Sequence, residues 1–242
     1  MSLDGEILVT GVSSGLGKTV TEQFPGCIAL NRQNRNEVIN ICRDKSLKAI
    51  IHCAFNSSNE ISDYYKYLDD NILLTNELLG LKYDKFVYIS SIGVYMDDCN
   101  YKTFKLLSEY LVKSKSENNL ILRSSAILGK NMRYNSLLKI LKENNLKLTL
   151  SKNSVFNYVL QNDIIDFIKY SINEDITGTF NFTSSDNISL GEVESYFNKN
   201  VIFGDFFYET PSLNNKKLID LFNQADRTSM EVINKFLDII DD

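Results

Sequence analysis

The fold of this 242-residue chain is decided by one stretch, Ile7-Leu8-Val9-Thr10-Gly11-Val12-Ser13-Ser14-Gly15-Leu16-Gly17. It begins in an apolar run of strand length and ends where residues 15–23 take up helical periodicity. Gly11 permits a tight turn, Gly15 lets backbone approach a pyrophosphate, and Gly17 allows close helix–strand packing. The helix N-terminus adds N–H groups and a partial positive charge. This context favours dinucleotide binding over an ordinary turn, with expected contacts from Gly11, Ser13, Ser14, Gly15, Leu16 and Gly17.

On either side of the loop, apolar bursts of strand length alternate with longer helical segments. The expected strands are 6–10, 27–31, 48–53, 85–91 and 120–123, and the expected helices between them are 15–23, 36–43, 60–81 and 101–115. Strands that are apolar on both faces belong to parallel sheets covered by helices. The sequence therefore predicts an α/β fold with a doubly wound parallel sheet of the Rossmann type.

After about residue 125, the alternation of strands and helices becomes less regular. Helices are expected over 136–143, 163–172, 190–198, 216–222 and 229–240, with short strands near 147–150, 157–160 and 178–182. No proline-rich or Gly/Ser-rich linker divides the chain. We therefore expect a single domain, with a dinucleotide-binding core in 1–130. Residues 131–242 are expected to form mainly a small substrate-binding lobe with interleaved core elements, and the substrate to lie in the crevice between core and lobe.

Composition narrows the range of functions. Lys plus Arg is 26 and Asp plus Glu is 31, which gives a formal charge of −5 and argues against nucleic acid as the main ligand. The apolar runs are too short for a membrane span, and no N-terminal targeting signal is visible. Four scattered cysteines indicate free thiols and a cytoplasmic location. With one histidine, no metal site is expected.

The end of the second strand bears on cofactor choice. NAD-preferring folds usually place an acid about 20 residues past the loop to hold the ribose 2′-OH. This chain has Asn31 and Arg32 there. Arg32 offers a planar fork for a 2′-phosphate, although a solvated turn residue is the alternative. NADP(H) is therefore favoured, and NAD(H) remains possible.

Three residues form a candidate reaction centre. Ser91 ends an apolar strand, and Tyr101 and Lys105 are four positions apart at the start of a helix, so they share one face. An ammonium beside a phenol favours phenolate and lowers the phenol pKa. Tyr101 can then exchange a proton with a substrate oxygen that the serine hydroxyl holds.

These segments resemble the short-chain dehydrogenase/reductase superfamily, in particular its extended, NAD-dependent epimerase/dehydratase-like branch. The similar motifs are Thr10–Gly17 (TGxxxGxG), Ile50–Ala54 (VIHLAA), Tyr88–Tyr95 with the active serine, and Tyr101–Lys105 (YxxxK). Segments 122–125, 157–165 and 178–182 extend the resemblance over nearly the whole chain. The loop spacing is instead that of the compact branch, and ten positions from Ser91 to Tyr101 is shorter than either branch normally shows.

The resemblance implies a role for each matching residue. Tyr101 is the acid/base, Lys105 binds the nicotinamide ribose and tunes Tyr101, and Ser91 orients the reacting oxygen. Asn71 steadies the lysine. Along the cofactor, Ala54 and Phe55 line the adenosine side, and Ser124 lies at the carboxamide.

These implications lead to one functional hypothesis with two alternatives. We expect an NADP(H)-dependent oxidoreductase that transfers a hydride between nicotinamide and a carbonyl/alcohol pair, on a sugar or nucleotide sugar. An NAD-dependent nucleotide-sugar epimerase is one alternative. A non-catalytic NADP sensor or scaffold is another, against which the Tyr101/Lys105 pair argues. A second copy of the chain is a possible partner, through the helices 60–81 and 101–115.

Overall fold

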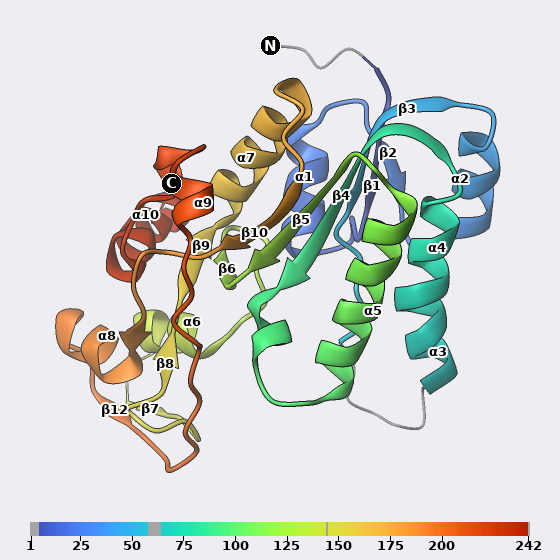
Figure 1. Ribbon diagram of the computed structural model, residues 1–242. Coiled ribbons are helices and arrows are strands. Elements are labelled where there is room, and N and C mark those ends of the chain that lie inside the picture. Colours follow the sequence, from blue (N-terminus) through green and yellow to red (C-terminus); the bar gives the residue numbers. More distant parts are fainter. Residues whose placement is uncertain (1–4, 58–63, 144, 242) are drawn as a thin grey trace.

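The computed structural model describes residues 5–57, 64–143 and 145–241. Within these ranges, six parallel strands form the central sheet in the order β10-β5-β4-β3-β1-β2 (Figure 1). Their bounds are β1 Ile7–Thr10, β2 Ile28–Leu30, β3 Ser46–His52, β4 Lys82–Ser91, β5 Asn119–Ser124 and β10 Gly178–Phe182. The chain runs from β1 outward to β2 and then returns to β3 on the other side of β1. The predicted doubly wound sheet is confirmed.

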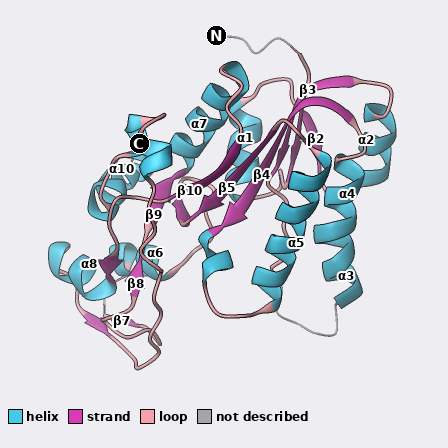
Figure 2. Ribbon diagram, viewed as in Figure 1, coloured by secondary structure: helices cyan, strands magenta, loops and turns pink. Residues whose placement is uncertain are grey.

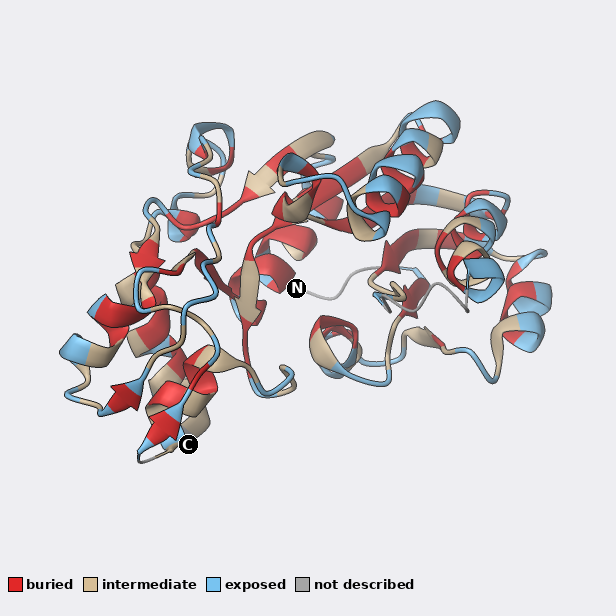
Figure 3. Cartoon of the chain, turned by 90° about the horizontal axis from the view of Figure 1, so that it is seen from below, coloured by how far each residue is buried: buried red, intermediate tan, exposed pale blue. Residues whose placement is uncertain are grey.

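Helices cover both faces of this sheet (Figure 2). On one face lie α1 (Gly15–Gln23) and α7 (Gln161–Asn173), whose Val20, Ile164 and Phe167 pack on strand residues such as Val9. On the other lie α2 (Arg35–Cys42), α4 (Leu74–Leu78) and α5 (Asn100–Lys115). The central strands are accordingly buried, while the helices keep exposed outer faces (Figure 3).

The long helix expected over 60–81 is interrupted. Residues 60–63 lie outside the described ranges. From there the chain forms α3 (Tyr64–Leu68), a π-helical turn (Asp69–Leu73) and then α4. The π-helical turn contains Asn71, which is buried against the sheet side of the helix. π-Helical turns often mark functional positions, and this one lies beside the candidate cofactor site.

The C-terminal half contributes both core and lobe. α7 and β10 join the core, whereas α6 (Ser136–Lys142), α8 (Leu190–Tyr196) and α10 (Ser229–Asp241) surround a separate apolar cluster that includes Tyr158, Ile233 and Phe236. Three two-stranded ladders complete the lobe: β6 (Ala126–Leu128) with β9 (Tyr158–Leu160), β7 (Leu146–Lys147) with β12 (Val201–Ile202), and β8 (Val155–Phe156) with β11 (Ile188–Ser189). A short helix, α9 (Lys216–Ile219), packs near β10. The division at residue 130 stays a prediction.

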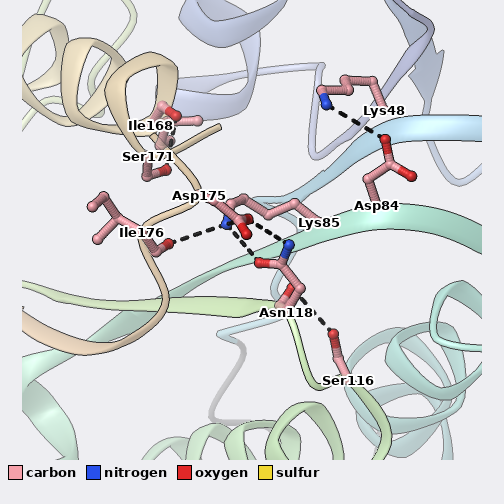
Figure 4. A network of polar contacts seen from close by, with 9 residues as sticks. All are labelled: Lys48, Asp84, Lys85, Ser116, Asn118, Ile168, Ser171, Asp175 and Ile176. Carbon is pink, nitrogen blue, oxygen red and sulfur yellow. Dashed lines mark hydrogen bonds and ion pairs between the residues drawn. The ribbon is translucent and has the colours of Figure 1, made fainter. Parts of the chain in front are cut away.

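The buried side chain of Lys85, near the start of β4, links this strand to neighbouring segments (Figure 4). Lys85 on β4 is 2 % exposed, and its Nζ donates to Asn118 Oδ1 at 2.6 Å and to the carbonyl oxygen of Ile176 at 3.2 Å. It also pairs with the carboxylate of Asp175 at 3.1 Å. Because a buried charge needs partners, these contacts tie β4 to the turn that leads into β10.

Candidate active site

The carboxyl ends of β1, β3, β4 and β5 meet at the point where strand order reverses, which is where ligands bind in open α/β sheets. Two adjoining clefts, each of about 310 Å³, share Gly11, Ser14, Ala54 and Phe55. The first continues to Asn31 and Arg32, and the second to Ser91, Tyr101 and Lys105. The structure thus brings the predicted loop, second-strand and reaction-centre residues onto one continuous surface.

The glycine loop has the geometry expected from its sequence. Gly11 and Gly15 have φ of +75° and +58°, a region that other residues rarely adopt. A Cβ at position 11 would lie 2.8 Å from the Ala54 nitrogen, and one at position 17 only 2.3 Å from the Gly11 oxygen. No side chain caps the start of α1. The cradle therefore fits a phosphate-bearing dinucleotide.

At the adenosine end, Arg32 already has a partner. Its guanidinium contacts the Asp70 carboxylate at 2.7 Å and 3.2 Å, and Asp70 also accepts from Asn56 Nδ2 at 2.9 Å. The Asn31 side chain faces its own turn, where it accepts from the backbone N–H groups of residues 33 and 34. Sequence reasoning missed Asp70 because it comes from the π-helical turn, 38 positions from Arg32.

A buried histidine links the loop to that turn. His52 Nδ1 lies 2.7 Å from Thr10 Oγ1, and Nε2 lies 2.9 Å from Thr75 Oγ1. Thr75 donates to the Asn71 carbonyl oxygen, and Thr10 accepts from the Ala54 N–H. Each threonine has one hydroxyl proton, so Nε2 carries the imidazole proton and Nδ1 accepts. Burial lowers the pKa of His52 to about 3, which makes it a neutral structural connector.

Asn71 itself does not touch Lys105 through its side chain. Its amide bonds with the Asn56 backbone, accepting at 2.7 Å and donating at 3.0 Å. Its carbonyl oxygen accepts from Thr75 and from Ser108 on α5. Asn71 therefore fixes the π-helical turn against the segment after β3.

Tyr101 and Ser91 meet despite the short spacing between them. A 3₁₀ turn, Ile92–Tyr95, follows β4, and Ser91 and Tyr101 line the same cleft. Gly93 makes this possible, because a Cβ there would lie 3.1 Å from Tyr101 Cε1 and 3.3 Å from Ser91 Oγ. The glycine at position 93, between Ser91 and Tyr95, is the feature of the sequence that signals this close contact.

Lys105 is buried in a dry setting. Its Nζ donates to the Ile89 carbonyl oxygen at 2.7 Å and lies 3.9 Å from the centre of the Phe55 ring. The same ring packs edge-on against Tyr101, with centroids 5.1 Å apart. Phe55 was expected only at the adenosine side, and it also covers the lysine.

The charge states of this pair follow from burial. Burial lowers the pKa of Lys105 to about 7. Burial also raises the pKa of Tyr101, and the nearby Ser91 hydroxyl only partly opposes this. Loss of solvation therefore outweighs the lowering of the phenol pKa expected from a neighbouring ammonium.

A buried ion pair anchors α5. Glu109, 2 % exposed, receives hydrogen bonds from Arg123 at 2.6 Å and 2.9 Å and from Ser90 Oγ at 2.6 Å. Arg123 also donates to the Tyr95 hydroxyl. Two strands and the 3₁₀ turn are thus tied to the helix that carries Tyr101 and Lys105. Ser124, the last residue of β5, is buried and lines the cleft that contains Tyr101 and Lys105.

Two further findings concern the chain as a whole. Within 5–57, 64–143 and 145–241, no three His, Cys, Asp or Glu side chains converge as a metal ion would require. Over the same part of the chain, no helix combines the length and apolarity needed to cross a bilayer.

Comparison with known proteins gives structural likenesses only. No protein-family model matches the chain, and no curated protein matches it. A dTDP-4-dehydrorhamnose reductase from Bacillus anthracis, solved with NADP, is 18% identical with a TM-score of 0.77, over 97% of this chain and 99% of that one. The Clostridium acetobutylicum reductase of that name is 18% identical with a TM-score of 0.73, over 98% and 100%. A Bacillus cereus UDP-glucuronic acid 4-epimerase, solved with NAD, is 17% identical with a TM-score of 0.72, over 96% and 99%.

The fold is a doubly wound α/β sheet of the Rossmann type, with two clefts at the carboxyl ends of its strands. More particularly, the chain has the fold of the extended short-chain dehydrogenases/reductases, as these neighbours do over nearly their whole length.

Proposed function

We propose that the chain is an NADP(H)-dependent oxidoreductase that reduces the carbonyl group of a sugar or nucleotide sugar, with Tyr101 as the acid/base. One observation carries the proposal. Tyr101 and Ser91 line one cleft, whose walls also include Lys105 and the glycine loop. The structural neighbours that act on nucleotide sugars add support at the level of the fold.

The residues present fit a nicotinamide dinucleotide. Gly11, Gly15 and Gly17 would hold the pyrophosphate, Ala54 and Phe55, which line both clefts, would lie along the cofactor, and Lys105 and Ser124 would contact its nicotinamide half. When bound, the nicotinamide supplies or accepts the hydride.

The chain's own groups handle the proton. Ser91 Oγ accepts from the Gly93 N–H at 3.0 Å, which leaves its hydroxyl proton for the oxygen of a substrate carbonyl. Because burial keeps Tyr101 protonated, its hydroxyl donates to that same oxygen as the alcohol forms. Phe55, by covering Lys105, keeps water from the lysine ammonium.

One observation favours a second candidate. Asp70 lines the adenosine cleft, and a carboxylate there suits the free 2′-OH of NAD. An NAD-dependent epimerase would use it in that way. A non-catalytic sensor would have no need of the Tyr101–Ser91 pair.

The deciding test replaces one hydroxyl. Tyr101→Phe should bind NADPH within about threefold of the parent affinity yet lose about 10²–10⁴ of turnover, the usual worth of a positioned acid. Binding is followed by nicotinamide fluorescence, and turnover by nicotinamide absorbance with 4-keto sugars, free and nucleotide-linked.

Tyr196→Phe is the matched control, because Tyr196 lies on α8, outside the clefts and the helices expected to pair, and is 58% exposed. Its turnover should equal that of the parent. Full activity of Tyr101→Phe would refute the acid/base role. Preference for NADH, or NAD retained through purification, would favour the epimerase.

We also infer that a second copy of the chain is the partner. The outer faces of α3 and α5 expose large apolar side chains, namely Tyr64, Tyr65, Leu106, Leu107 and Tyr110. These are the two helices named for dimerisation on sequence grounds, and their exposed apolar faces support that pairing.

A further inference from the structure

A third cavity lies beyond the reaction centre and has chemistry of its own. It measures about 510 Å³ and opens from Ser91 and Tyr101 toward the lobe. Its walls are the 3₁₀ turn and residues 96–99 on the core side, and Phe156, Tyr208 and Thr210 on the lobe side. A substrate that reaches Tyr101 from the lobe must lie here.

The lobe side of this cavity is aromatic. The rings of Phe156 and Tyr208 stack with centroids 4.8 Å apart and an interplanar angle of 24°. The Tyr208 hydroxyl donates to Met96 Sδ at 3.6 Å, which joins the lobe to the core at the cavity wall. A flat aromatic surface beside hydroxyl groups suits a sugar ring, because the ring offers an apolar C–H face and a polar rim.

The charged residues that line the cavity, among those the structure describes, are all acidic. Asp97 and Asp98 line it, and no Lys or Arg does so among the described residues. The segment 91–99, which supplies half of the lining residues, contains these two acids and no basic residue.

Two cations from neighbouring segments are paired or line another cleft. Lys102 Nζ pairs with Asp98 at 2.9 Å and donates to the Met96 carbonyl oxygen at 2.8 Å. Arg133 lines the cofactor cleft, where its charge can pair with the pyrophosphate. Asp97 therefore leaves the cavity negatively charged.

From these walls we infer that the substrate ring carries no phosphate or diphosphate and is a neutral or, preferably, amino-substituted keto-sugar. The inference rests on the proposed function and selects between its two substrate classes. A nucleoside diphosphate in this cavity would meet carboxylates where binding requires cations. An ammonium on the ring would instead pair with Asp97.

The thiol of Cys99 can be used to measure the electrostatic potential at the cavity wall. It is an exposed free thiol on the cavity wall. Peptide mass spectrometry gives the rates at which iodoacetate and iodoacetamide alkylate Cys99. Both reagents react with the thiolate, so the thiolate fraction cancels in the ratio of the two rates. Because only iodoacetate is charged, the ratio reports the local charge. Asp97→Asn should raise that ratio about threefold, the effect of one nearby exposed charge. Asp44→Asn, a distant exposed acid, should leave it unchanged.

The second measurement asks which ligand protects Cys99 from iodoacetamide with NADPH present. Glucosamine should protect at the lowest concentration, glucose at a higher one, and UDP-glucose least. Asp97→Lys should reverse the order of glucosamine and UDP-glucose. Protection by UDP-glucose ahead of both sugars, or by none of the three, overturns the inference. Failure to bind NADPH would count against the proposed function instead, and the alkylation ratio would still report the charge of the cavity.

Discussion

Arg32 and Asp70 meet at the mouth of the adenosine cleft, where two planar groups share two hydrogen bonds. The Arg32 side chain is 66% exposed, so solvent screens the pair and its net worth is at most about 1 kcal/mol. A 2′-phosphate can therefore displace Asp70 from the guanidinium at little cost. When the cofactor carries no 2′-phosphate, the Asp70 carboxylate can accept a hydrogen bond from the ribose 2′-hydroxyl.

This arrangement predicts opposite effects of two substitutions on cofactor choice. Arg32→Ala should weaken NADPH about tenfold or more and leave NADH nearly unchanged, because only the phosphate loses a charged partner. Asp70→Asn should strengthen NADPH relative to NADH, since it removes both a competitor and a repulsive charge. Titrations followed by nicotinamide fluorescence measure both ratios. An equal loss of the two affinities in Arg32→Ala would mean that Arg32 does not read the phosphate.

Single residues also mark how far sequence reasoning reaches in the site. The glycine loop and the Ser91, Tyr101 and Lys105 set, which were chosen on local spacing, line one cleft in the structure, and their roles stay predictions. The cover that Phe55 places over Lys105 could not be predicted, since it depends on the path of the chain after β3. The contact of Gly93 with Tyr101 likewise requires the turn to be folded.

At the scale of elements, α5 is held to the sheet by the Glu109–Arg123 pair. Burial by itself raises a carboxyl pKa, yet hydrogen bonds from Arg123 and Ser90 hold the pKa of Glu109 below its ordinary value. Glu109→Gln leaves the half-buried Arg123 guanidinium without its counter-charge and should cost about 1–3 kcal/mol of unfolding free energy, measured by urea denaturation. Lys113→Met removes only an exposed 3.5 Å contact to the same carboxylate and should change little. Similar losses in the two variants would show that the pair does not anchor the helix.

Elements of the core could be predicted more fully than those of the lobe. The core strands are continuous apolar runs, which are typical of parallel sheets buried on both faces. The lobe strands β6, β8, β11 and β12 have two or three residues each, too few for any periodicity to register. The π-helical turn was also missed, because its sequence keeps the apolar spacing of an ordinary helix.

For the molecule as a whole, the burial of Lys105 lowers the free energy of unfolding by an amount that depends on pH. Burial lowers the pKa of Lys105 from 10.5 to about 7, so the unfolded chain binds more protons between these values. The stability contributed by this site therefore rises with pH across that window, and the full cost of burying the ammonium applies below about pH 7.

Lys105→Met should remove this cost and the activity together. The variant is expected to be more stable than the parent by up to about 4 kcal/mol near pH 6, because an apolar side chain replaces a desolvated charge. The advantage should shrink toward about pH 9, where the folded parent already holds a neutral amine. Urea denaturation at both pH values measures the difference, with Lys113→Met as the exposed-lysine control from the same helix. A stability difference that stays constant with pH would mean that Lys105 titrates in the folded protein as it does in the unfolded chain, and that its dry cover does not set its charge.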